Sequence, residues 1–321
     1  MRVRRFALVL FVLVTARAFS WAPATHVYLA ERATGSNHPD VYFGSILPDM
    51  SHVVINKPEI AKVMRRLGHY ESGRVEPSCL ALGMLTHNEE WGTDWYAHQY
   101  FLSDTPESAD LYSTVKIRHL EAELGVQPGE AEFLFEFAID YLLRVDDGPA
   151  LGRKMLAGAT LFGPTREQMI VDAFAAPLAK RVHGLSLEEA ETELRTAARR
   201  FRSVTKAYAT AYMQDEALAF EALTAFTALY LQFDCDTAAA YLSYAIELCR
   251  DDYQAELERI AELLRADLAT HAPEPVAACS WGCSGPVGTT AAAGFDPLLA
   301  VWAFVGIAWT RAVRARNVPS R

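Results

Sequence analysis

Residues 186–211 read SLEEAETELRTAARRFRSVTKAYATA, which is the pattern of one long helix. Ser186 is a typical N-cap residue, and the glutamates that follow it place negative charge in the first turn, where it stabilises a helix. Most of the remaining residues have high helix propensity. We therefore predict a helix over residues 186–211.

The same helical pattern continues through residues 214–233 and 236–269. Runs of alternating β-branched residues are missing, and the sequence has no internal repeat, no glycine-rich phosphate loop and no GxSxG motif. Neither a nucleotide-binding fold nor a serine hydrolase is therefore expected. Breaks between the earlier helices are predicted at Pro128-Gly129, Gly148-Pro149 and Gly163-Pro164. The sequence predicts a single all-α domain over residues 21–270.

The first twenty residues have the pattern of a secretory signal peptide. A basic start is followed by an apolar run over residues 6–14 and then by Ala18-Phe19-Ser20, with small residues at the cleavage position. We predict cleavage after Ser20, which would make Trp21 the first residue of the mature chain. The alternative is an uncleaved anchor, but the apolar run is shorter than the roughly 20 residues of a spanning helix.

The C-terminal end has its own organisation. Residues 271–294 form a predicted linker that contains Cys279 and Cys283, and residues 295–321 carry an apolar run followed by arginines. This order resembles the C-terminal sorting tails of exported myxobacterial proteins. It predicts a sorting or anchor tail and display at the cell surface or outer envelope, with release after trimming as an alternative. An amphiphilic C-terminal helix of a soluble protein would have a similar pattern.

Composition and charge limit the class of partner. The chain has 321 residues, of which 51% are hydrophobic and 22% charged, as expected for a globular protein. Eight of its 30 basic residues lie in the two terminal segments, which leaves 22 against 40 acidic residues in the body, a charge of about −18. So acidic a body does not suit double-stranded nucleic acid, whose phosphates require Lys and Arg. It is compatible with bound cations.

Histidines and carboxylates fall at helical spacings between residues 87 and 123. His87, Asp94 and His98 are at i, i+7 and i+11, which places them within about 20° of one helix face. His119 and Glu123 are at i and i+4, a spacing that lets two side chains hold one Zn²⁺. A single histidine is more often an ordinary core or surface residue. Five such residues in one short region indicate a metal site.

Three acidic residues follow at the same helical spacing. Glu132, Glu136 and Asp140 are at i, i+4 and i+8, among aromatic and aliphatic residues. Ordinary solvated acids are the default explanation for such a stripe. The alternative is a role next to the metal, in which these carboxylates accept hydrogen bonds from the ligating imidazoles.

Two short segments resemble the zinc-dependent phospholipase C and P1/S1 nuclease superfamily. They are Trp21-Ala-Pro-Ala-Thr-His26 and Phe43-Gly-Ser-Ile-Leu-Pro-Asp49, the second being similar to the superfamily's G-x-x-x-P-D segment. The resemblance covers about residues 21–145 and implies a multi-helix, all-α domain of this type. In the superfamily, the processed N-terminal Trp binds zinc through its α-amino nitrogen and carbonyl oxygen. Signal cleavage would then be a condition of activity.

The resemblance also implies three Zn²⁺ ions and their ligands. His52 is the alternative to His69, and Asp49 is also the candidate catalytic base. The implied sets are Asp49, His69, His87 and Asp94 for the first ion, His98, His119 and Glu123 for the second, and Trp21 and His26 with a bridging Asp94 for the third.

One spacing departs from the superfamily. His87 lies seven residues before Asp94, where four residues are usual, and Glu90 occupies the expected place. Seven residues span roughly 10 Å of helix, which is long for two ligands of one ion. We expect a bulge or break at Gly92 to absorb the extra turn and His87 to be the ligand. Glu90 is the alternative.

The implied function is an exported zinc-dependent phosphodiester hydrolase, with water activated by zinc for in-line attack on phosphorus. A phospholipase C-type reaction on a phospholipid is favoured, because the acidic body disfavours nucleic acid and surface tethering places the enzyme near membranes. Other phosphodiesters are possible substrates, and a membrane surface is a possible partner. The alternatives are a P1/S1-like single-strand nuclease and a non-catalytic surface protein stabilised by zinc.

Overall fold

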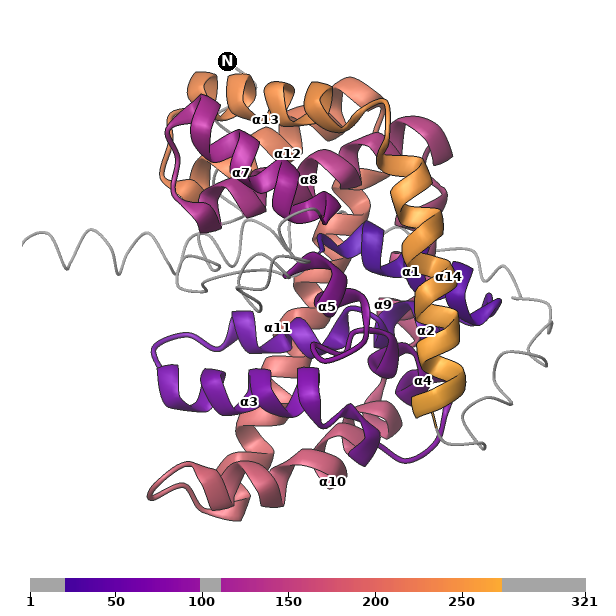
Figure 1. Ribbon diagram of the computed structural model, residues 1–321. Coiled ribbons are helices and arrows are strands. Elements are labelled where there is room, and N and C mark those ends of the chain that lie inside the picture. The colour runs from indigo at the N-terminus through magenta and orange to yellow at the C-terminus, as the bar shows by residue number, and fades with distance from the viewer. Residues whose placement is uncertain (1–20, 99–110, 273–321) are drawn as a thin grey trace, which may run out of the picture.

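The computed structural model describes residues 21–98 and 111–272 (Figure 1). The predicted signal peptide, the C-terminal tail and nearly all of the linker lie outside these residues. Every regular element in the described part of the chain is helical, which confirms the all-α class. Within the same residues, no helix combines the length and the apolar character needed to cross a membrane.

The first part of the domain consists of short elements, and the second of longer helices. The first comprises α1 (Pro23–Thr34), α2 (Pro39–Gly44), the 3₁₀ segment η2 (Leu47–Val53), α3 (Pro58–Tyr70), the 3₁₀ turn η3 (Ser72–Arg74), α4 (Cys79–Thr86), α5 (Thr93–Ala97) and α7 (Tyr112–Leu124). The second comprises α8 (Pro128–Asp147), α9 (Ala150–Leu161), α10 (Pro164–Arg181), α11 (Leu187–Tyr212), α12 (Glu216–Leu231), α13 (Cys235–Cys249) and α14 (Tyr253–His271).

All three predicted breaks coincide with helix boundaries. Helices α8 and α10 begin at prolines, as expected because a first-turn N–H has no partner within the helix. The predicted helix over residues 236–269 is wrong, because the chain turns at residues 250–252 and forms α13 and α14 instead. At this turn, Asp252 accepts hydrogen bonds from Lys116 Nζ at 2.6 Å and Tyr112 Oη at 2.7 Å.

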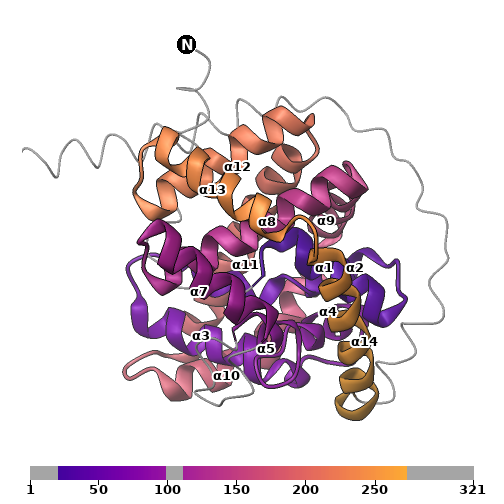
Figure 2. The same ribbon diagram turned by 45° about the horizontal axis from the view of Figure 1, so that its top comes forward.

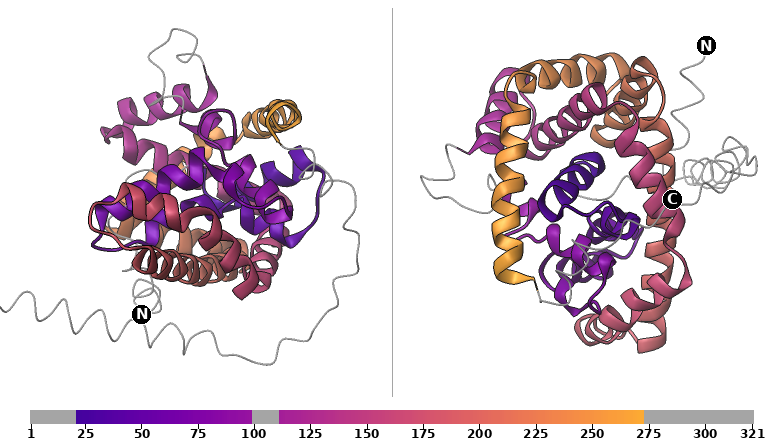
Figure 3. Two further views of the ribbon diagram at one scale, coloured as in Figure 1. Left: turned by 90° about the horizontal axis from the view of Figure 1, so that it is seen from below. Right: turned by 90° about the vertical axis from the view of Figure 1, so that its right-hand side faces the viewer.

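The short N-terminal elements lie inside a frame of later helices. In the right panel of Figure 3, the indigo and purple segments are surrounded by α14 on one side and by the α11–α13 region on the others. Helix α1 lies near the centre and packs against α2, α8, α9 and α14 (Figure 2). The segments that carry most of the predicted ligands are therefore in the interior of the domain.

Helix α1 is capped by a residue of another helix. Its own N-cap residue, Ala22, has no side chain that could accept a hydrogen bond. Asp140 of α8 supplies the cap instead and accepts bonds from Ala24 N at 2.9 Å, Thr25 N at 2.8 Å and Thr25 Oγ1 at 2.6 Å. Tyr208 Oη donates a further bond of 2.6 Å to this carboxylate. Asp140 thus fixes the start of α1.

Two glycines allow α2 and α4 to approach closely. A Cβ atom on Gly44 would lie 2.3 Å from Leu80 O, and one on Gly83 would lie 2.3 Å from Val41 O. Any larger residue would separate the two helices. This contact places the end of α2 beside the end of α4, where His87 follows.

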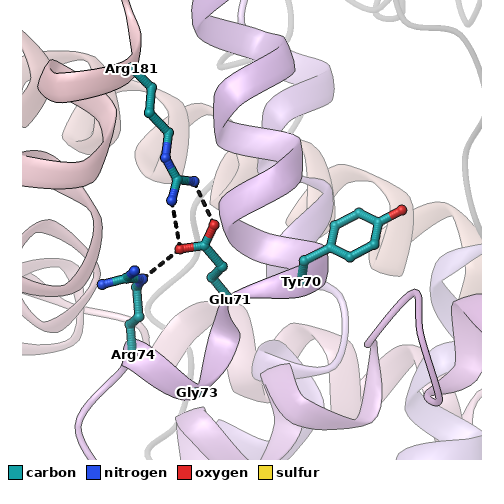
Figure 4. Close-up of a pocket in the computed structure, with 5 residues that line it drawn as sticks. All are labelled: Tyr70, Glu71, Gly73, Arg74 and Arg181. Atoms are coloured by element: carbon teal, nitrogen blue, oxygen red, sulfur yellow. Dashed lines mark hydrogen bonds and ion pairs between the residues drawn. The ribbon is translucent and has the colours of Figure 1, made fainter.

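A polar hollow lies at the surface where α3 and η3 approach α10 (Figure 4). Glu71 lies between two arginines, with Oε2 2.6 Å from Arg74 Nε and Oε1 2.5 Å from Arg181 Nη1. The Glu71–Arg181 ion pair links the two parts of the domain. None of the predicted metal ligands lines this hollow.

Candidate metal centre

Most of the predicted ligands are buried. None of the following is more than 3% exposed: Trp21, His26, Asp49, His69, His87, Asp94 and His98. Burying so many ionisable groups is costly unless each is paired or bound to a metal. Each of these buried side chains therefore needs a partner or a bound metal ion within the core.

Five of these residues form one group, which we call the histidine-rich group: His26, Asp49, His69, His87 and Asp94. They come from α1, η2, α3, the end of α4 and the start of α5. Two overlapping sets of donor atoms lie within 4.8 Å of one another, namely His26, His87 and Asp94, and Asp49, His69 and His87. The two sets share His87, and either of them could hold a metal ion.

Asp94 faces imidazoles of both donor sets of the histidine-rich group. Its Oδ1 lies 3.7 Å from His26 Nε2, whereas its Oδ2 lies 3.2 Å from His69 Nε2 and 3.1 Å from His87 Nε2. A carboxylate whose two oxygens face different imidazoles is placed to bridge two cations.

The imidazoles are anchored through their other nitrogen. His69 Nδ1 lies 2.9 Å from Arg65 O, and His87 Nδ1 lies 2.6 Å from Ser45 O. A carbonyl oxygen only accepts, so Nδ1 carries the hydrogen in both rings, and a neutral ring then presents the lone pair of Nε2 to the carboxylates. Thr93 Oγ1 lies 2.9 Å from His26 Nδ1 and orients the third ring. Such anchoring is typical of metal-binding histidines.

The carboxylates lack hydrogen-bond donors. Both oxygens of Asp94 and Oδ1 of Asp49 are buried without a hydrogen bond, although His87 Nε2 lies 3.1 Å from Asp94 Oδ2 and 3.6 Å from Asp49 Oδ1. Nitrogen lone pairs and carboxylate oxygens that converge on one point repel each other unless a cation lies between them. The residues present therefore fit a bound metal ion.

The electrostatics of the metal-free chain show the same need for positive charge. Burial opposes protonation of His87, but Asp94 and Asp49 beside it raise its pKa well above the usual value. Burial and the neighbouring His87 lower the pKa of His26 to about 3. Burial raises the pKa of Asp94, yet His87 outweighs this effect and holds the pKa below its usual value. A proton on His87 takes the place of a cation here.

A second group consists of His98, Glu132 and Glu136, which we call the glutamate-rich group. One donor atom of each residue lies within 4.8 Å of the other two, and His98 Nε2 is 3.8 Å from Glu132 Oε1. On the other side of the ring, Glu89 Oε1 lies 3.8 Å from His98 Nδ1. The two glutamates of α8 are each 1% exposed, and none of their carboxylate oxygens has a hydrogen bond.

The structure does not bring His119 and Glu123 to His98. Helix α7 buries the face that contains Ile117 and Leu120, so His119 and Glu123 lie on its exposed side. His119 Nε2 lies 2.9 Å from Tyr244 Oη of α13. The positions next to His98 are taken by glutamates of α8.

The interpretation of the α8 stripe as solvated acids is wrong. Glu132 and Glu136 belong to the glutamate-rich group, and Asp140, which is fully buried, caps α1. The signal that could have revealed this was the sequence around them. Phe133 and Phe137 each follow one of the glutamates directly, as expected for a helix that is buried on several sides.

The structure places the alternative ligands differently. His52 Nε2 is 3.2 Å from Asp49 Oδ1, but it is His69 that joins Asp49 and His87 in a common donor set. Glu90 is exposed. The extra residues before Asp94 form a turn between α4 and α5, with Gly92 as the N-cap of α5. This break, rather than one continuous helix, brings His87 to Asp94.

Trp21 lies at the edge of the histidine-rich group. Its indole Nε1 donates a hydrogen bond of 3.0 Å to Thr93 O, and its ring packs against Phe135 with centroids 5.2 Å apart. Thr93 directly precedes Asp94 and contacts His26. The first described residue of the chain is thus linked to two members of the group through one threonine.

No protein-family model matches the chain, and no curated protein or solved structure is significantly similar to it. The geometry of the site shows several buried groups of His, Asp and Glu that could bind a metal ion.

Proposed function

We propose that this chain is a zinc-dependent phosphodiester hydrolase of the phospholipase C type, with the fold of the phospholipase C and P1 nuclease superfamily. The observation that carries the proposal is the position of Asp94, whose two oxygens face different imidazoles of two overlapping donor sets. Adjacent metal ions that share a ligand are characteristic of enzymes that hydrolyse phosphate esters.

In this proposal, the five residues of the histidine-rich group are divided between two zinc ions. Asp49, His69 and His87 would hold one ion and His26 the other, with Asp94 between them. Imidazole and carboxylate ligands are those that zinc prefers. The α-amino nitrogen of Trp21 is proposed as a further ligand of the ion at His26, which requires removal of residues 1–20.

The chain's own residues have distinct parts in the proposed reaction. Bound zinc supplies a water of lowered pKa and positive charge for the phosphate and the leaving oxygen. Asp49, whose Oδ1 has no hydrogen bond, orients or deprotonates the attacking water. The anchors on His69 and His87 hold Nε2 toward the ion, so that no reorientation is needed during the reaction.

The proposed substrate is a phospholipid at a cell surface. The acidic body opposes electrostatic binding of a nucleic-acid backbone, whereas a lipid headgroup presents a single phosphodiester. Export and surface display, as predicted from the two ends of the sequence, would place the enzyme beside this substrate.

A second function is favoured by one observation. Every member of the histidine-rich group is at most 3% exposed, and closed sites of this kind are typical of structural zinc, which has no position for a reacting water. A non-catalytic protein stabilised by zinc is therefore the competing proposal.

The experiment combines metal content with turnover. The chain beginning at Trp21 is reconstituted with zinc and assayed on bis-p-nitrophenyl phosphate, phosphatidylcholine and single-stranded DNA, beside a chain with one extra N-terminal residue. Bound zinc with hydrolysis that weakens in the extended chain supports the first proposal, and zinc without hydrolysis of any substrate supports the second. Failure to bind zinc would remove both.

A further inference from the structure

The glutamate-rich group differs chemically from the histidine-rich group. It contains one imidazole and two glutamates, with the third carboxylate, Glu89, on the other side of the ring. Carboxylate oxygens suit harder cations such as Mn²⁺, whereas imidazoles suit zinc. The two groups should therefore differ in the metal that they accept.

The glutamates are placed as ligands rather than as supports for other residues. Glu132 and Glu136 are one helical turn apart on α8, so both side chains point to the same place. Neither accepts a hydrogen bond from an imidazole or a backbone N–H, which a supporting carboxylate would do. Two buried carboxylates so close together cannot both be charged unless a cation is bound.

Helix α8 holds these two side chains in a fixed position. Phe133, next to Glu132, stacks on Tyr230 with ring centroids 4.2 Å apart, and Phe137 stacks on Phe226 at 5.0 Å. Asp140 ties the next turn of α8 to the start of α1. A rigid helix that presents two buried carboxylates without hydrogen bonds is a preorganised cation site.

We propose that His98, Glu132 and Glu136 form a separate divalent-cation site that accepts Mn²⁺ more readily, relative to zinc, than the histidine-rich group does. The ligand atoms lie within 4.8 Å of one another, and a small contraction would bring them to the roughly 2.0–2.2 Å at which imidazole nitrogens and carboxylate oxygens bind a divalent metal ion such as zinc. This inference does not depend on the proposed hydrolysis, because the binding of the metal can be measured without substrate.

The test loads the two groups in turn. The metal-free chain receives two equivalents of Zn²⁺, since zinc in excess would displace manganese from most sites. Mn²⁺ is then titrated, and its bound fraction is followed by electron paramagnetic resonance. We expect about one Mn²⁺ per chain, and binding weakened more than about tenfold in Glu136→Gln and Glu132→Gln. Asp147→Asn, on the exposed end of α8, is the control and should bind as the wild type does.

Two results would overturn the proposal. The first is no Mn²⁺ binding by the zinc-loaded wild type, and the second is binding that neither glutamine variant weakens. Circular dichroism of each metal-free variant checks the fold. The variants should fold, because glutamine has the shape of glutamate and removes a repulsive buried charge.

Discussion

The histidine-rich and glutamate-rich groups solve the problem of buried charge differently. In the first, imidazoles alternate with carboxylates, and the protein anchors each ring through Nδ1 to an oxygen of the backbone or of Thr93. In the second, two carboxylates share one imidazole, and no hydrogen bond of the protein satisfies the glutamate oxygens. Protons can replace metal in the first group at the cost of one charged histidine. In the second group, burial lowers the pKa of His98 but Glu132 and Glu89 raise it to about 9, and burial raises the pKa of Glu132 to about 7, so protons can replace the metal there as well.

The difference between the two groups shows that burial of the residues and anchoring of the imidazoles provide separate information about a metal site. Burial alone marks all of these residues as unusual. The anchoring of Nδ1 identifies which atoms face the metal, and the lack of hydrogen bonds on the oxygens identifies where charge is missing.

The largest effect is expected for Asp94→Asn. The amide removes the bridging charge between the two donor sets, so we expect zinc content to fall and kcat/KM on bis-p-nitrophenyl phosphate to drop about 10³-fold or more, since several kcal/mol of charge stabilisation are lost. Manganese binding at the glutamate-rich group should be nearly unchanged. Asp251→Asn, at an exposed position, is the matched control. Equal zinc content in Asp94→Asn and the wild type would contradict the role of Asp94 as a ligand between the two donor sets.

A smaller effect is expected for Asp140→Ala. Its carboxylate caps α1 through two backbone N–H groups and the hydroxyl of Thr25. Leaving these donors unpaired should lower the free energy of unfolding by about 2–3 kcal/mol. Urea denaturation in the presence of a chelator measures this, with Asp147→Ala as the control on the same helix. Unchanged stability would show that α1 does not need the cap.

Thr93→Val tests the anchor of His26. Loss of the contact between Oγ1 and Nδ1 should weaken zinc binding about 10–100-fold, as is usual for residues that orient metal ligands. Thr93→Ser keeps the hydroxyl and should bind zinc as the wild type does. If the valine and serine variants bind equally, the ring is held by packing alone.

The smallest effect is a pH dependence of the metal-free protein. Burial lowers the pKa of His98, but Glu132 and Glu89 raise it to about 9, so the stability that protonated His98 contributes is present below pH 6.5 and is lost as pH rises through 9. Burial raises the pKa of Glu132 from 4.5 to about 7. The stability that protonated Glu132 contributes is therefore also lost as pH rises through 7. The free energy of unfolding of the chelated chain should therefore fall with rising pH.

With Mn²⁺ bound, the direction reverses, because the cation competes with protons for the same atoms. The stabilisation by metal should then increase with pH. Urea denaturation across this pH range, with and without Mn²⁺, measures both trends. Parallel curves for the two states would contradict the assignment of the glutamate-rich group.

The sequence predicted the all-α fold and most of the histidine-rich group. Helix breaks at proline and glycine are local signals, and Pro128 and Pro164 begin helices as expected. The break at Gly92 that joins His87 to Asp94 was also predictable from local spacing. The turn at Asp252 was not, because it is stabilised by Lys116 and Tyr112, which are distant in sequence.

The partners of His98 were predicted from helical spacing together with the resemblance, and this was insufficient. His119 and Glu123 have suitable helical spacing, but the phase of α7 turns them outward, since its buried face is defined by Ile117 and Leu120. Glu132 and Glu136 have the same spacing on a helix whose position depends on tertiary packing. Helical spacing determines which residues share a face of a helix. Tertiary packing determines whether that face points to the core or to solvent.

The central claim is tested most directly by counting metal ions in the chain that begins at Trp21 after reconstitution with excess zinc and removal of unbound metal. We expect about three ions per chain in the wild type, and a clear loss in Asp94→Asn with the ion of the glutamate-rich group retained. A folded wild-type chain that holds no metal after reconstitution would contradict this claim.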